Sequence, residues 1–241
     1  NNGSTDGTKK IIDDFQFNNP EIKLEIVNIQ KNDGLPNGRN AGLSIAKGIY
    51  VMFHDADDWM DNDCLESLYN ATKDKKYCRI MQEVKYINDD SKLVDILKYP
   101  NDASPWSKNT LQGDAFYRDI ITTNNITFSK NAYYDDFYFT CQFTSYADSF
   151  SFIRTAHYNM LLHTGSMTHK YNADQEYFID KLNKTYRVMI DIPSRINDTN
   201  FELYEYACKK SYTDRQLLDF TYSDTLIKKY NNSLNDFEKI V

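Results

Sequence analysis

Residues 49–53 (IYVMF) followed by residues 54–58 (HDADD) are the stretch that decides the fold. An unbroken apolar run of this length is typical of a strand covered on both faces, as in a parallel sheet. In layered α/β domains, ligands bind beyond the carboxyl ends of such strands. The acidic residues after position 54 therefore stand where a ligand site is expected.

The residues before this strand alternate between helix and strand patterns. Ile11, Ile12 and Phe15 stand at helical spacing, and Asn18-Asn19-Pro20 ends that helix. Ile22, Leu24 and Ile26 alternate with polar residues, which indicates a strand. Residues 37–47 are predicted to be helical, with Gly48 as the C-cap. The alternation predicts an α/β fold.

The same patterns continue towards the C-terminus. We expect helices over residues 62–78 and 111–123, and another that starts near Phe137. Residues 79–87 are predicted to form a strand, with a turn at 89–91. From about residue 172 onward the pattern is mostly helical.

Composition excludes several classes of protein. The chain has 241 residues, is 41% hydrophobic and has a formal net charge of −7. That apolar content argues against disorder, and an acidic chain without a basic block is a poor candidate for binding nucleic acid. No run approaches the roughly 18 apolar residues that a membrane span needs. The four scattered cysteines are expected to be free thiols in a reducing compartment (Cys64, Cys78, Cys141, Cys208).

The acidic stretch suggests a metal site. Asp55 and Asp57 are two residues apart, so in an extended chain both carboxylates point the same way. Such a pair can bind Mg²⁺ or Mn²⁺, which prefer oxygen ligands. The alternative is a solvated acidic loop that caps the helix after Trp59.

Several blocks of sequence together resemble the family 2 glycosyltransferases of the GT-A fold, over about residues 1–170. The blocks are residues 2–8 (NGSTDGT), 38–43 (GRNAGL), 50–58 (YVMFHDADD), 104–108 (SPWSK), 125–128 (NITF) and 134–139 (YDDFYF). The resemblance implies a mainly parallel sheet flanked by helices, plus a C-terminal helical extension.

The resemblance also implies how the chain is divided. Residues 1–171 would form the catalytic domain, with residues 1–100 as the donor and metal half and residues 101–171 as the acceptor half. Residues 172–241 would be the helical extension. Family members have a strand, a helix and a second strand before the loop at which this chain starts, so we expect an N-terminally truncated domain.

Site residues follow from the matching positions. Asp57 resembles the family's direct ligand for Mn²⁺ or Mg²⁺, and Asp55 would also serve the metal while lying nearer the nucleotide ribose. Asp135 and Asp136 are similar to a Glu-Asp pair in which the second acid is the catalytic base. Asp136 could instead simply cap the helix that follows it.

Donor-binding roles are implied for five further residues. Asn2 and Asp6 belong to the opening loop, Arg39 and Asn40 match an Arg-Asn pair beside the donor pocket, and Trp106 would pack near the donor sugar or acceptor. Arg39 as a solvated or salt-bridged residue and Trp106 as plain core remain alternatives.

Histidines offer a third metal ligand. His54 adjoins the acidic pair, and His163 and His169 flank a segment that resembles one closing over the donor phosphates. Either of the latter two could bind the metal, and the alternative is an exposed or hydrogen-bonded histidine.

The resemblance predicts an inverting glycosyltransferase for bacterial surface polysaccharide or glycoconjugate synthesis. It would use a nucleotide-sugar donor, foremost a UDP-sugar, and a carbohydrate or lipid-linked acceptor. The alternatives are a metal-dependent nucleotidyltransferase or phosphohydrolase and a degenerate sugar-binding module. We expect a cytoplasmic protein, peripheral at the inner membrane face if its acceptor is there, and a homo-oligomer if the C-terminal helices pair.

Overall fold

The computed structural model describes residues 1–73, 76–99, 101, 103–105, 110–129 and 135–165. Trp106, His169 and the expected helical extension at 172–241 lie outside the described residues. The chain forms an α/β structure, which confirms the predicted fold class.

The helix predicted over residues 62–78 covers only Cys64–Thr72, and the strands at 59–60, 93–97 and 150–162 were not predicted. The described elements otherwise follow the sequence predictions, apart from the differences given below. In order they are α1 (Thr8–Asn18), α2 (Leu35–Ile45), β1 (Tyr50–Met52), β2 (Trp59–Met60), α3 (Cys64–Thr72), β3 (Arg79–Asn88), β4 (Leu93–Leu97), β5 (Ala115–Tyr117), α4 (Arg118–Thr123), α5 (Asp135–Tyr146) and β6 (Phe150–Leu162).

Six strands form one mixed sheet rather than the mainly parallel one that was expected. The hydrogen-bonded order is β1-β5-β3-β6-β2, with β4 paired to β3. Of the ladders between described strands, β3 with β6 is parallel and the others are antiparallel. The difference arises because β5 runs opposite to β1 and β3, β4 runs opposite to β3, and β2 runs opposite to β6.

Strand β5 also corrects the predicted helix over residues 111–123. The segment begins with a turn at 111–114, becomes extended at Ala115–Tyr117, and is helical only in α4. Gly113 has φ +78°, a left-handed conformation that a right-handed helix cannot include. The apolar residues of this segment therefore correctly predict that it is buried, but the helix predicted from their spacing is wrong for residues 111–117.

The predicted strand at Ile22, Leu24 and Ile26 is not formed. Only Asn1 and Asn2 of the described chain pair with this region, through one parallel bridge between Asn2 and Ile29. The Asn1 amino group also donates to the Val27 carbonyl at 2.9 Å. A strand needs a ladder of backbone partners, and two residues supply only its end.

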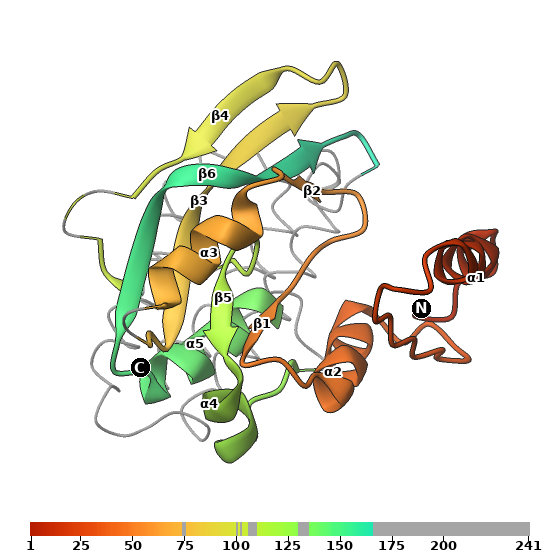
Figure 1. The fold of residues 1–241 in the computed structure, drawn as a ribbon, viewed down its shortest axis with the longest axis horizontal. Coiled ribbons are helices and arrows are strands. Elements are labelled where there is room, and N and C mark those ends of the chain that lie inside the picture. The colour runs from red at the N-terminus through yellow and green to blue at the C-terminus, as the bar shows by residue number, and fades with distance from the viewer. Residues whose placement is uncertain (74–75, 100, 102, 106–109, 130–134, 166–241) are drawn as a thin grey trace, which may run out of the picture.

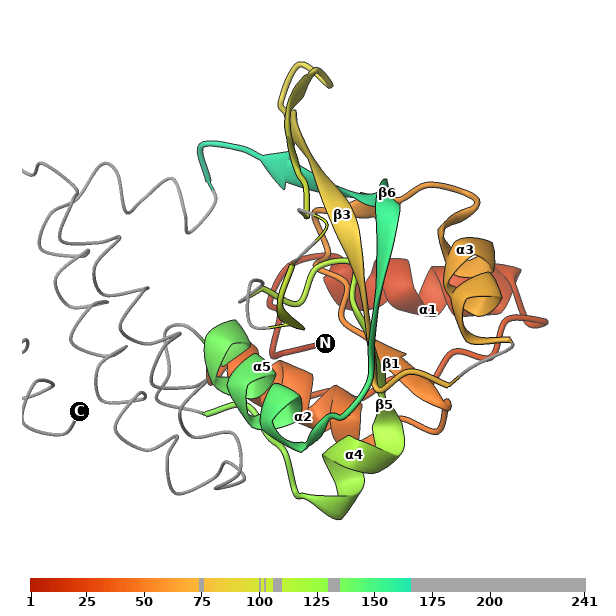
Figure 2. The same ribbon diagram turned by 90° about the vertical axis from the view of Figure 1, so that its left-hand side faces the viewer.

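Two apolar clusters cover the two faces of the sheet. Figures 1 and 2 show α3 on one face and α2, α4 and α5 on the other. Successive side chains of β1 and the residue after it alternate between the clusters. Val51 and Phe53 pack against the aromatic cluster of α4 and α5, while Tyr50 and Met52 pack against the cluster below α3. The strand is packed on both faces, as predicted, but its residues remain half-buried.

Helix α1 adds nothing to these clusters. It buries none of its residues, and Ile11 and Phe17 are 70% and 84% exposed. Figure 1 shows it at the edge of the molecule, away from the sheet. No helix within the described ranges combines the length and apolar character needed to cross a membrane.

A buried ion pair joins β3 to the turn before β5. Arg79 and Asp114 are both fully buried, and the guanidinium donates to one carboxylate oxygen at 2.7 and 2.9 Å. Arg79 also donates to the Thr144 hydroxyl of α5 at 3.1 Å. The pair thus ties the sheet to the turn and to α5.

Replacing Arg79 by Met should destabilise the protein by about 3–5 kcal/mol, because Asp114 would stay buried without its partner. Urea unfolding measures the change. Lys92→Met is the control, since its pair with Asp90 is exposed and spans 3.8 Å, and it should change stability by less than about 1 kcal/mol. Equal effects of the two variants would contradict this assignment.

Candidate active site

A single guanidinium holds three carboxylates at the carboxyl end of β1. Arg39 of α2 donates to Asp55 at 3.1 Å, to Asp135 at 2.9 Å and to Asp136. Its side chain is only 8% exposed. The structure therefore brings together the acid after β1 and the acidic pair that starts α5, which lie 80 residues apart in the sequence.

Excess negative charge in this cluster shifts the proton affinity of its acids. Burial, and then repulsion from Asp136, raises the pKa of Asp135 to about 6, although Arg39 opposes the shift. Burial likewise raises the pKa of Asp136 against the stabilising effect of Arg39. Burial disfavours the charged form of Arg39 itself, but the carboxylates more than offset this and raise its pKa. A carboxylate of raised pKa suits proton transfer.

Both carboxylate oxygens of Asp55 are already bonded. Oδ1 accepts from Arg39, and Oδ2 accepts from the Gln112 side-chain amide at 2.9 Å. The Asp55 backbone N–H donates to the Tyr158 hydroxyl at 3.2 Å. Asp55 is thus fixed in place, and a metal ion could use it only by displacing one of these donors.

Asp57, by contrast, is half exposed and lies beside an imidazole. Its Oδ2 is 3.1 Å from Nε2 of His163, at the end of β6. Of the two candidate histidines within the described residues, His54 and His163, it is His163 that lies against a carboxylate of the acidic stretch. The ring of His54 lies 2.7 Å from the Asp55 carbonyl and 5.3 Å from the Tyr158 ring.

Asp58 is a further functional position that sequence reasoning missed. Its carboxylate accepts from the Tyr158 hydroxyl at 2.7 Å and from the Leu161 backbone N–H at 2.9 Å. Burial raises the pKa of Asp58 against these bonds. Asp58 therefore anchors the acidic loop to β6. No local signal reveals this role, because both partners lie about 100 residues further along the chain.

A cleft of about 520 Å³ opens beside the cluster. Its walls include Asn2, Val27, Val51, Arg39 and Asp55. The Asn2 side-chain carbonyl is buried and has no hydrogen-bond partner within the described part of the chain, whereas its amide donates to the Gly34 carbonyl at 2.8 Å. The cleft is therefore bounded by Asn2 on one side and by Arg39 and Asp55 of the charged cluster on another.

Two predicted donor-binding side chains are bonded elsewhere. Asn40 donates to the Phe128 carbonyl and accepts from its N–H, both at 2.9 Å, which ties α2 to the segment before α5. Asp6 is exposed and accepts from the Thr8 backbone N–H at 2.9 Å at the start of α1. The structure therefore gives both residues local structural roles.

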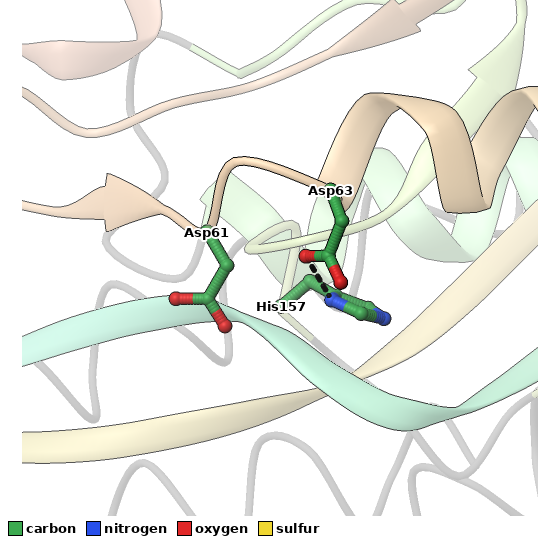
Figure 3. Close-up of side chains that lie close together, drawn as sticks. All are labelled: Asp61, Asp63 and His157. Carbon is green, nitrogen blue, oxygen red and sulfur yellow. Dashed lines mark hydrogen bonds and ion pairs between the residues drawn. The ribbon is translucent and has the colours of Figure 1, made fainter.

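A second group of candidate metal ligands lies at the start of α3. Ligand atoms of Asp61, Asp63 and His157 fall within 4.8 Å of one another (Figure 3). His157 is 2.9 Å from Asp63, and Asp61 accepts from Lys85 at 2.6 Å and Asn159 at 2.8 Å. A divalent ion would have to displace the Lys85 ammonium, so the group forms an ion-pair network that is complete without a metal.

Comparison with known proteins adds family information. The family model described as glycosyl transferase family 2 matches residues 1–137. A cholesterol galactosyltransferase from Borreliella burgdorferi is 29% identical over 188 residues, which are 69% of this chain and 51% of that protein. A hyaluronan synthase from Pasteurella multocida is 33% identical over 95 residues, which are 39% of this chain and 10% of that protein. The chain spans about half the length of the first relative.

Solved structures share the fold at low sequence identity. Residues 1–349 of S. aureus TarS in complex with UDP-GlcNAc give a TM-score of 0.77 at 16% identity, covering all of this chain and 70% of that chain. The mannosyltransferase PcManGT from Pyrobaculum calidifontis, in complex with GDP-Man and Mn²⁺, gives 0.61 at 16% identity, covering all of this chain and 65% of that chain.

The raised pKa of Asp135 predicts a pH-dependent gain in stability for Asp135→Asn. Its folded pKa of about 6 exceeds the ordinary value of 3.8, so the ionised carboxylate costs stability above pH 6 and nothing below pH 4. Urea unfolding should show that the variant is more stable than the wild type by about 1–3 kcal/mol at pH 7.5 and equally stable at about pH 4.

Asp90→Asn is the matched control, because Asp90 is 73% exposed and should change stability little at either pH. A loss of stability in Asp135→Asn that is the same at pH 4 and pH 7.5 would contradict the electrostatic account of the cluster.

Proposed function

The chain belongs to glycosyl transferase family 2 and has the GT-A fold, and on this premise we propose that it is an inverting, metal-dependent sugar transferase. It would move a sugar from a nucleoside-diphosphate donor to an acceptor hydroxyl. The observation that carries the proposal is the Arg39 cluster, which unites Asp55 of the acidic stretch with Asp136 of the acidic pair. The donor sugar and the acceptor hydroxyl would come together at that cluster.

Asp136 is proposed as the general base. The acceptor oxygen would attack the anomeric carbon, the bond to the diphosphate would break, and the acceptor proton would pass to the Asp136 carboxylate. A raised pKa makes this carboxylate a better proton acceptor, and Arg39 favours its ionised form before the reaction. A single displacement from the opposite side inverts the anomeric carbon, so no covalent sugar–enzyme intermediate is required.

Asp57 and His163 are proposed as the protein ligands of Mn²⁺ or Mg²⁺. Their oxygen and nitrogen atoms lie 3.1 Å apart, and both side chains are partly exposed, so an ion and diphosphate oxygens can reach them. The carboxylate of Asp57 suits Mn²⁺ or Mg²⁺, and the PcManGT complex contains Mn²⁺ with GDP-Man. A bound divalent ion would stabilise the charge of the leaving diphosphate. Asp55 is proposed to orient this site from behind, since both its oxygens are bonded.

The cleft is proposed to hold the donor nucleotide. Asn2, at the wall of this cleft, would contact the base or ribose. A UDP-sugar is the favoured donor, because TarS binds UDP and UDP-GlcNAc, although PcManGT binds GDP-Man. Matches to galactosyltransferase and hyaluronan synthase sequences support an acceptor that is a carbohydrate or lipid-linked glycoconjugate in bacterial surface polysaccharide synthesis. Association with the inner membrane face and homo-oligomerisation stay predictions.

Thermal shift with a panel of nucleotide sugars, with and without Mn²⁺, tests the donor and metal together. The correct donor with Mn²⁺ should stabilise the protein by about 2.7 kcal/mol at a concentration of 100 Kd. Asp57→Ala should lose the effect of Mn²⁺ on donor binding. Asp63→Asn is the control, because it removes an exposed acid that pairs with His157 away from Asp57, and should keep that effect.

Activity separates transfer from the alternatives. Asp136→Asn should keep the donor-induced shift and lose transfer by about 10²–10⁴-fold, measured as nucleoside diphosphate released in the presence of acceptor. Release of phosphate without any acceptor would instead identify a phosphohydrolase. Donor binding that ignores both Mn²⁺ and Asp57 would identify a sugar-binding module and overturn the proposal.

A further inference from the structure

A buried turn at residues 111–114 lies between the sheet and the acidic cluster, and its polar side chain Gln112 has no role in the proposed function. Residues Leu111, Gln112 and Asp114 are 0%, 7% and 0% exposed, and the Asp114 N–H donates to the Leu111 carbonyl at 3.0 Å. Polar side chains this deeply buried must be bonded, so their partners define what the turn does.

One side of this turn is fixed to the sheet. Asp114 forms the buried ion pair with Arg79, and the Gly113 carbonyl accepts from the Gln82 amide at 2.5 Å. Gly113 has φ +78°, and a Cβ there would lie 2.8 Å from the Gln82 side chain and 3.2 Å from Tyr158. The turn therefore cannot shift without disturbing β3, which makes it a rigid base.

The other side of the turn faces two carboxylates of the cluster. The Gln112 amide donates to Oδ2 of Asp55 at 2.9 Å, and the Leu111 backbone N–H donates to Asp136. Two adjacent residues of one fixed turn thus hold Asp55, which lies beside the proposed metal site, and Asp136, the proposed base.

We propose that Gln112 is a positioning residue, which holds Asp55 so that Arg39 is shared correctly between Asp55 and Asp136. The inference rests on the proposed function for its catalytic consequence. A neutral amide suits this place for an electrostatic reason. A second cation would compete with the divalent ion expected at nearby Asp57, and another carboxylate would repel Asp55. An amide fixes the geometry and leaves the net charge of the cluster unchanged.

The test compares Gln112→Met, which keeps the length of the side chain and removes its donor, with Gln142→Met. Gln142 is a matched control, because it is 2% exposed and donates to backbone carbonyls of Thr127 and Tyr138 at 3.0 Å. Both variants should lose stability, since each leaves buried acceptors unpaired. Only Gln112→Met should weaken binding of Mn²⁺ with UDP, by about 10- to 100-fold, measured by electron paramagnetic resonance.

A second readout does not depend on catalysis. The side-chain ¹³C carboxyl resonance of Asp55 should move in Gln112→Met and stay in place in Gln142→Met. If that resonance and the affinity for Mn²⁺ with UDP are both unchanged in Gln112→Met, the proposal is wrong, whether or not the protein transfers sugar. If the resonance moves in a protein that transfers no sugar, the positioning role stands and the proposed function fails.

Gln112→Glu supplies a readout that a purely structural role would not give. The introduced carboxylate repels Asp55 when it is ionised, whereas its protonated form can donate an O–H to Asp55, and burial beside other acids favours the protonated form. Transfer activity of this variant relative to wild type should therefore rise by about 10-fold or more as the pH falls from about 8 to about 6. A constant ratio across this range would overturn the proposal.

Discussion

The site depends on one buried guanidinium shared by three carboxylates. Arg39 is the cation that faces Asp55, Asp135 and Asp136, so these groups together keep an excess of two negative charges when all are ionised. In a buried place such an excess raises proton affinity and attracts further positive charge. Both effects are useful for chemistry, because the first produces a base and the second favours a divalent ion beside the cluster. The same excess of negative charge therefore destabilises the buried cluster and equips it for catalysis.

The residues around Arg39 are held in place by hydrogen bonds and by an ion pair that lie outside the charged cluster. Tyr158 of β6 bonds Asp58 and the Asp55 backbone, and the turn that carries Gln112 is locked to β3 by Arg79 and Asp114. Strands β3 and β6 form the one parallel ladder between described strands. Strand β6 bonds the acidic loop directly, and β3 holds it through the turn that carries Gln112. The two longest strands of the sheet thus fix the positions of the acidic loop and of the turn that carries Gln112.

Sequence reasoning succeeded where one local signal sufficed and failed where a distant partner decided the outcome. The apolar run before Asp55 correctly marked a strand with packing on both faces. The pattern of residues 111–123 indicated burial, but it could not reveal that β1 and β3 leave room for one short strand between them. No neighbouring residue indicates that the Asn40 amide is bonded to Phe128, and a donor-binding role of Asn40 stays a prediction.

By itself the sequence determined the α/β class, the family and the acidic residues at the end of β1 and at the start of α5. These are properties of local pattern and spacing. Only the tertiary structure decided that Asp55 and Asp136 share one cation, that Asp57 has His163 beside it, and that Gln112 reaches the cluster. The physical reason is that burial and electrostatic interaction depend on distances through space. Residues far apart in the sequence acquire those distances only when the sheet and its helices have packed.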